Sequence, residues 1–214
     1  MKRLLTLMLT AALSLPVWAL DEAGQARLHA VQTRWAEIQY QLPEVQREAA
    51  LEKLAAESAA FTREQPQAAE AWVWHGIVTS SWAGAQGGLG ALGKAKDAKA
   101  YLEKAIALDP GALQGSAYTS LGTLYDRVPG WPIGFGDEDK ADQLLRQALQ
   151  VNPEGIDSLY FWGDHLLRQG HYVEAKAALE KARQAAPRPG RELADSGRQG
   201  EIDQLLLEVN KKLN

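Results

Sequence analysis

One stretch of the sequence carries residues at the spacing of a phosphate-binding loop. Gly88, Gly93 and Lys94 match Gly-x4-Gly-Lys, and Gly90 adds a match to the dinucleotide pattern Gly-x-Gly-x2-Gly. Both patterns need a β-strand before the glycines, whereas the residues that lead into Gly88 predict a helix. Ala95 also stands where a phosphate-binding loop has the Ser or Thr that holds magnesium. We therefore expect no nucleotide site and no cofactor.

The four histidines do not form a metal or catalytic pattern. They fall on different predicted helices or at a turn, without a His-x3-His or Glu-x2-His pair. His75 replaces an apolar residue of a helix, so we expect a buried, hydrogen-bonded histidine. Asp164 precedes His165, but adjacent helical residues point about 100° apart and cannot form an acid–base dyad unaided. No Gly-x-Ser-x-Gly nucleophile motif is present. The sequence predicts neither a metal site nor an enzyme.

The N-terminus has the pattern of a secretory signal peptide. Lys2 and Arg3 are followed by an apolar run, 4–15, and by the small residue Ala19. The run is shorter than the roughly 20 apolar residues that span a bilayer. We therefore expect cleavage after Ala19, no stable membrane anchor and a periplasmic location.

Composition narrows the classes of partner. The 214 residues include 27 acidic and 23 basic side chains, for a formal net charge of −4, which argues against nucleic acid or anionic lipid as a partner. Cysteine is absent, so the chain has no disulfide, thiolate site or lipid-attachment cysteine. The length suits one or two compact units.

Two motifs each occur three times, and they define predicted helices that carry His75 and His165 and flank the glycines described above. The pattern Ala-x3-Leu-x2-Ala-x4-Pro occurs as Ala98, Leu102, Ala105, Pro110, as Ala141, Leu145, Ala148, Pro153, and as Ala175, Leu179, Ala182, Pro187. A second motif precedes each copy: a large residue, after two intervening positions a residue followed by glycine, and a further residue after two more positions. Its copies are Trp72-x2-His75-Gly76-x2-Thr79, Tyr118-x2-Leu121-Gly122-x2-Tyr125 and Leu159-x2-Trp162-Gly163-x2-Leu166. Small residues allow two helices to approach closely, large ones fill the groove between them, and proline ends the hairpin.

This pattern resembles the tetratricopeptide repeat (TPR) over residues 66–187. The resemblance implies an all-α TPR-like α-solenoid of antiparallel helical hairpins, whose first helices line a concave groove for a protein or peptide partner. The plan is also similar to small periplasmic TPR proteins, including the T component of TRAP-type solute transporters. That similarity implies contact with a solute-binding protein and a small hydrophobic ligand.

Repeat spacing reveals two insertions. The distance from Pro153 to Pro187 is 34 residues, the natural period, but the two preceding intervals between prolines are 44 and 43. Most of the excess falls between the helices of each hairpin, around 84–94 and 128–137. We expect two enlarged inter-helix loops, which stacking of the repeats would place side by side.

The second insertion is unusual for a surface loop because it is apolar. It contains Trp131, Ile133 and Phe135, with prolines that reduce the entropy lost on ordering. Two compatible interpretations remain: the loop caps the gap left by the Gly-rich insertion, or both loops wall a ligand or peptide cleft.

The resemblance also places a mostly polar set of residues on the concave groove. Arg127 and Arg168 each lie a helical turn from an aspartate, so these charges either pair across hairpins or bind a ligand. The candidate partner-binding residues of groove and loops are Trp131, Phe135, Tyr125, Asp126, Arg127, Tyr160, Asp164, Arg168, Thr123 and Trp82.

The resulting organisation is a signal peptide (1–19), an N-terminal helical hairpin that is a degenerate repeat (20–66), three TPR-like repeats (67–189) and a C-terminal loop with a capping helix (190–214), the helix being expected over 200–212. The predicted function is a noncatalytic periplasmic adaptor that engages a protein or peptide through the groove and the aromatic loop. The alternative is a small-molecule carrier associated with a periplasmic transporter.

Overall fold

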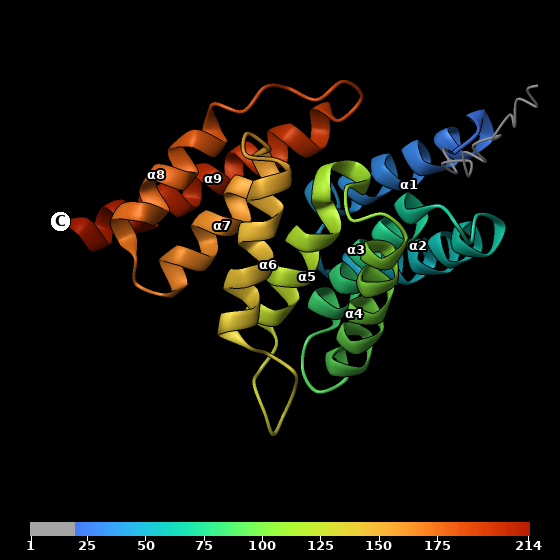
Figure 1. The fold of residues 1–214 in the computed structure, drawn as a ribbon, viewed down its shortest axis with the longest axis horizontal. Coiled ribbons are helices and arrows are strands. Elements are labelled where there is room, and N and C mark those ends of the chain that lie inside the picture. Colours follow the sequence, from blue (N-terminus) through green and yellow to red (C-terminus); the bar gives the residue numbers. More distant parts are fainter. Residues whose placement is uncertain (1–19) are drawn as a thin grey trace, which may run out of the picture.

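The computed structural model describes residues 20–214, which form nine α-helices, one short 3-10 helix and no strand (Figure 1). The predicted signal peptide lies outside the described residues. The elements are α1 (Glu22–Tyr40), α2 (Glu44–Glu64), α3 (Ala69–Gln86), α4 (Ala91–Leu108), η1 (Ala112–Gly115), α5 (Ser116–Arg127), α6 (Glu138–Val151), α7 (Ile156–Arg168), α8 (Tyr172–Arg183) and α9 (Glu192–Leu213).

The repeated small residues pack the helices in antiparallel pairs. Each helix contacts the next along the chain, and the motif alanines and leucines of α4, α6 and α8 are almost fully buried. Within each repeat, the glycine of the first helix lies against the leucine of the second. The pairs are Gly76 with Leu102, Gly122 with Leu145 and Gly163 with Leu179. The predicted α-solenoid is confirmed.

The first insertion differs from the expected loop because helices absorb most of it. Helix α3 continues to Gln86 and α4 begins at Ala91, which leaves only residues 87–90 between them. Both helices have 18 residues, against 13 in α7 and 12 in α8. Gly84 and Gly93 lie inside these helices in open space, so nothing packs against them. Only the 128–137 insertion forms a long loop, at the same lower edge as the 87–90 turn (Figure 1).

The last helix begins eight residues before the expected boundary and reaches both ends of the array. Ile202, Leu206 and Val209 are buried against α7 and α8, as expected for a capping helix. The N-terminal half of α9 extends further, because Ala194 packs into the core that contains α1 (Figure 1). Helix α9 therefore closes the solenoid between its last hairpin and its first helix.

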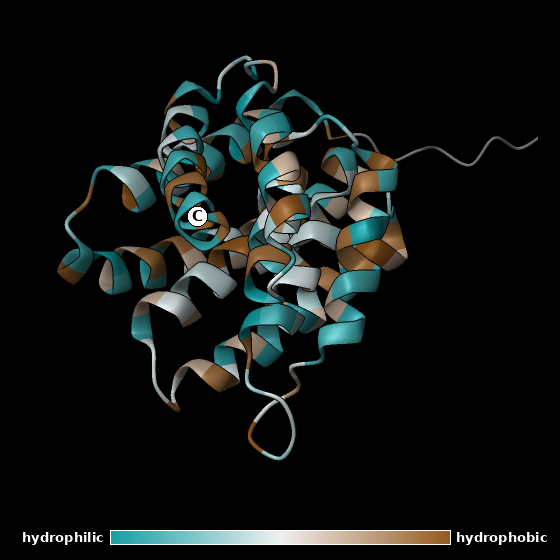
Figure 2. Ribbon diagram, turned by 90° about the vertical axis from the view of Figure 1, so that its left-hand side faces the viewer, coloured by the Kyte–Doolittle hydropathy of each residue, from teal (hydrophilic) through white to brown (hydrophobic). Residues whose placement is uncertain are grey.

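Apolar residues gather on the facing sides of the helices. Figure 2 shows polar and apolar residues interleaved along the helices, with a loop that projects at the lower edge. Within residues 20–214, no helix combines the length and the apolar character that crossing a membrane requires.

Candidate partner-binding surface

The loop between α5 and α6 has a closed base. The amide of Gly136 donates to the carbonyl of Pro129 (3.0 Å), and the amide of Asp137 donates to the carbonyl of Tyr125 (3.0 Å). The Asp137 side chain caps α6 by accepting a hydrogen bond from the amide of Lys140 (3.0 Å). Because these bonds join its two ends, the loop is a fixed projection.

The two faces of this loop have different environments. The ring of Phe135 folds back edge-to-face onto Tyr125, with 5.4 Å between centroids, and Lys99 of α4 lies 5.7 Å from the Phe135 ring. Lys99 lies outside the Gly-rich insertion, so this contact does not test the capping interpretation, which stays a prediction. At the tip, Trp131 is 91% exposed and Ile133 is 59% exposed. The base of the loop is therefore part of the core, and the tip is free for contact.

The charged residues of the groove pair across hairpins. Arg127 of α5 forms an ion pair with Asp164 of α7, and Arg168 of α7 pairs with Asp126 of α5 at 3.1 Å. The side chain of Asp126 is only 5% exposed, so the second pair is largely shielded from water. Mutual pairing, one of the two alternatives, is what the geometry shows.

Sequence reasoning missed the partner of His165. Its Nδ1 lies 2.8 Å from Oδ1 of Asp126, and not beside Asp164. Asp126 accepts this hydrogen bond, which leaves Nε2 directed toward α6, 3.9 Å from Asp142. Repeat stacking predicts that α5 lies beside α7, but nothing in the sequence indicates that the side chains of Asp126 and His165 point toward each other.

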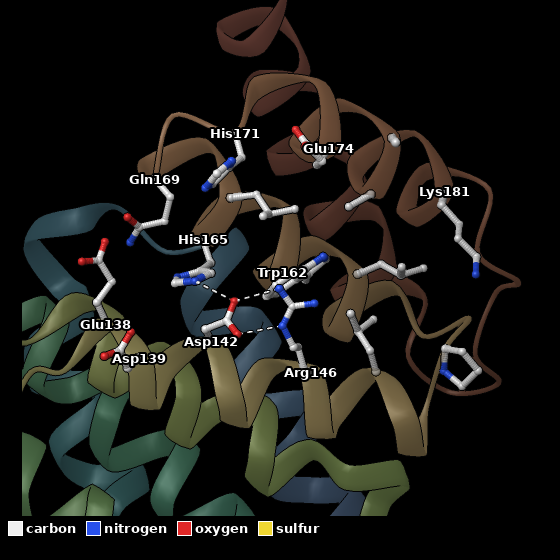
Figure 3. A pocket seen from close by; sticks show the side chains of 16 residues that line it. Glu138, Asp139, Asp142, Arg146, Trp162, His165, Gln169, His171, Glu174 and Lys181 are labelled. Atoms are coloured by element: carbon white, nitrogen blue, oxygen red, sulfur yellow. Dashed lines mark hydrogen bonds and ion pairs between the residues drawn. The ribbon is translucent and has the colours of Figure 1, made fainter.

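A groove of about 880 Å³ opens on the other side of His165, between α6, α7 and α8 (Figure 3). Trp162 lines it, with the guanidinium of Arg146 4.5 Å from its ring and paired with Asp142 at 2.7 Å. Glu138 at the start of α6 also lines the groove, so the groove begins where the aromatic loop ends.

The residues that line this groove are mostly charged and polar. None of its lining residues carries a hydroxyl or thiol, and its acidic groups are Glu138, Asp139, Asp142 and Glu174. Across residues 20–214, no group of three or more His, Asp or Glu side chains is placed to hold a metal ion. The groove therefore offers one aromatic wall, Trp162, among charged and polar side chains.

Helix α9 covers part of the concave groove where the sequence predicted an open surface, and a cavity of about 530 Å³ remains beside Ser116, Thr119 and Asp157. The guanidinium of Arg198 in α9 lies 4.2 Å from the Tyr160 ring, and its Nε donates to Asp157 at 2.8 Å. Burial alone would raise the pKa of Asp157, but Arg198 and Arg188 more than offset this and lower the pKa to about 2. Tyr160 is therefore covered by the chain itself.

The other two candidate residues lie apart from the loop tip. The hydroxyl of Thr123 donates to the carbonyl of Thr119 in its own helix at 2.8 Å. Trp82 packs beside the N-terminal core, with Lys94 4.2 Å from its ring. Lys94 also donates to Gln86 at 2.6 Å, so the lysine of the phosphate-loop lookalike is engaged within the α3–α4 hairpin.

Comparisons with known proteins agree with the helical pairing. Two family models, both described as tetratricopeptide repeat, match residues 133–195 and 89–111. No curated protein gives a significant match. A similar solved structure is TTC0263, a thermophilic TPR protein in Thermus thermophilus, with 19% identity, a TM-score of 0.58 and coverage of 87% of this chain and 85% of that one. Another is MamA 41-end from Desulfovibrio magneticus RS-1, with 14% identity, a TM-score of 0.44 and coverage of 89% and 98%.

At these identities the structural likeness concerns the fold alone. The repeat models add the sequence evidence, because they cover all three copies of the Ala-x3-Leu-x2-Ala-x4-Pro motif and the glycine helix of the third repeat. The chain therefore contains tetratricopeptide repeats and has the fold of a TPR-like α-solenoid.

Proposed function

We propose that this protein is a noncatalytic adaptor that binds a protein partner through the tip of the 128–137 loop. The observation that carries the proposal is Trp131, 91% exposed on a loop whose base is hydrogen-bonded. Tryptophan is enriched among the few residues that supply most of the energy of an interface. A loop that is already ordered loses little entropy on binding.

The residues after the tip indicate the chemistry of the partner. Asp137, Glu138 and Asp139 are consecutive, exposed and acidic, next to the apolar tip formed by Trp131 and Ile133. An apolar pocket that receives the tip and is rimmed by Lys or Arg would complement both features. The partner that fits is therefore a protein with a basic-rimmed hydrophobic pocket.

The adaptor is exported to the periplasm in this proposal. Its support is the basic start, the apolar run and Ala19 within residues 1–19. Mass spectrometry of the protein from a periplasmic fraction should give a chain that begins at Leu20. A chain that retains residues 1–19, or that stays in the cytoplasm, would reject the export.

The loop is tested by partner capture with matched variants. Trp131→Ala should lower the affinity for the captured partner at least tenfold, because it removes the tip without touching the core. Leu207→Ala is the control, since Leu207 is an exposed apolar side chain of α9 (63%). Equal capture by Trp131→Ala, with circular dichroism equal to wild type, would reject the proposal.

A second candidate function is favoured by the groove of about 880 Å³ beside Trp162. A small-molecule carrier, as the resemblance to the T component of TRAP-type transporters implies, would hold its ligand there. Native mass spectrometry after gentle purification should then show extra mass on the wild type that Trp162→Ala loses. A protein of bare chain mass would leave the adaptor as the better proposal.

A further inference from the structure

Three arginines of one C-terminal segment point at acceptors on the inner side of the solenoid. Arg188 and Arg198 each donate to a different oxygen of Asp157, at 2.7 and 2.8 Å. The guanidinium of Arg191 lies 5.0 Å from the ring of Trp74 in α3. Every arginine between residues 184 and 201 is therefore engaged by the inner surface.

The inner surface provides the groups that bind guanidinium. Arg198 lies over two rings at once, 4.2 Å from Tyr160 and 4.6 Å from Phe161. Carboxylates accept the guanidinium fork, and aromatic faces attract its planar cation; an ammonium lacks both the plane and the fork. Trp74, Asp157, Tyr160 and Phe161, which we term the acceptor set, suit arginine better than lysine.

Some of the charge on these arginines is neutralised within their own segment. Asp195 accepts from Arg188 at 2.7 Å, and Glu201 pairs with Arg198. Asp157 nevertheless contributes both of its oxygens, and its side chain keeps 34% of its surface exposed. Part of the Asp157 side chain therefore remains at the surface, although Arg188 and Arg198 occupy both carboxylate oxygens.

The segment is held by these polar contacts together with apolar packing against the N-terminal helices. Between residues 187 and 201 only Ala194 and Arg198 are fully buried, while Leu193 packs partly against the N-terminal core and Gly197 lies against the Tyr40 ring. The second half of α9 is anchored differently, by Ile202, Leu206 and Val209. The first half therefore buries fewer apolar side chains than the second half.

We infer that the acceptor set is a binding site for an arginine-bearing peptide segment of a protein partner, and that residues 187–201 occupy this site in cis. The attached segment has an effective concentration on the order of millimolar, so a partner engages the site when this segment is weakened or outcompeted. The site is separate from the Trp131 loop and does not depend on it.

The test uses isotope-labelled protein and a synthetic peptide of residues 187–201. In the double variant Arg188→Ala/Arg198→Ala, which frees both oxygens of Asp157, the peptide should shift the backbone amide signal of Asp157 in a saturable manner. Wild type should need at least tenfold more peptide, because its own segment fills the site. The indole signal of Trp131 should stay unchanged in both proteins.

Modified peptides test the preference for guanidinium. Citrulline in place of the three arginines keeps the shape and removes the charge, and should abolish the shift. Lysine at the same positions should bind at least threefold more weakly. An absent shift in a folded double variant, or equal shifts with the citrulline peptide, would overturn the inference.

A milder variant keeps the inference testable if the double variant does not fold. Arg191→Ala uncovers only the Trp74 ring and leaves both contacts of Asp157 in place. N-acetyl-arginine amide should then shift the Trp74 signal more than N-acetyl-lysine amide, and equal shifts would refute arginine selectivity. Adding Trp131→Ala should leave these titrations unchanged, so the result is independent of whether the loop binds a partner.

Discussion

Replacing Gly163 by alanine has two opposite effects on stability: the higher helix propensity of alanine stabilises the protein, and the added methyl group crowds the core. A Cβ at residue 163 would lie 2.7 Å from Cγ and 2.9 Å from Cδ2 of Leu179, which is fully buried. Alanine gains about 1 kcal/mol over glycine inside a helix, whereas overpacking a core costs about 1–3 kcal/mol. The contact is with the branch point of Leu179 and not with a flexible end, so we take the packing cost from the upper part of this range, about 2–3 kcal/mol. We expect Gly163→Ala to lower the free energy of unfolding by about 1–2 kcal/mol.

Gly200→Ala is the matched control, because it is the same substitution inside a helix without the contact. No heavy atom lies within 4 Å of a Cβ at residue 200, so only the propensity remains. This variant should gain about 0.5–1 kcal/mol. Urea unfolding followed by far-UV circular dichroism measures both, provided that the urea dependence (m) is equal among the proteins. Gly163→Ala as stable as wild type, beside a stabilised Gly200→Ala, would refute the packing role of the motif glycine.

Three further predictions concern the loop, a buried histidine and α9. Trp131→Ala should change the free energy of unfolding by less than about 0.5 kcal/mol, whereas Phe135→Ala should lower it by about 1–2 kcal/mol, since only Phe135 packs on the core; urea unfolding distinguishes them. Burial, with a smaller effect of Arg63, lowers the pKa of His75 from 6.5 to about 4, so the unfolded chain takes up the proton first and stability falls as pH drops from 6.5 toward 4. At pH 4.5, compared with pH 7, the free energy of unfolding of wild type should therefore fall by on the order of 2–3 kcal/mol more than that of His75→Gln. Equal losses in the two proteins would show that His75 does not have this lowered pKa. Raising NaCl to molar concentration should speed amide hydrogen exchange in residues 192–200 more than in 202–212, because ion pairs hold the first half of α9; a uniform change would contradict this.

The hairpins were predictable because their information is local. Alanines and leucines at fixed helical spacing, each opposite a glycine, are enough to specify two packed helices and their order. The structure of the 84–94 insertion was not predictable in this way. Its glycines indicated a loop, whereas Gly84 and Gly93 lie within helices that are longer than those of the third repeat. Helix propensity and the longer α3–α4 contact outweigh the glycine signal there.

The inner surface was the least predictable part, because it depends on contacts between distant segments. Arg198 is a charged residue buried in the protein, which no hydropathy pattern reveals. Residues 192–199 look like a loop by composition, and they are helical where Ala194 and Arg198 meet α1 and α7. His165 and Asp126 likewise meet only because α5 and α7 are neighbours in the stack.

The contact between α9 and α1 fixes how many units the protein has. An open repeat array gains or loses a unit freely, since each unit touches only its neighbours. Here a duplicated hairpin would carry α9 away from α1, and would separate Ala194 from the N-terminal core and Glu201 from Tyr40. Duplication of a hairpin would therefore disrupt the α1–α9 contact, unless that contact formed again in the longer array. The length of this solenoid is encoded in its two outermost helices, and the repeats between them carry no such limit.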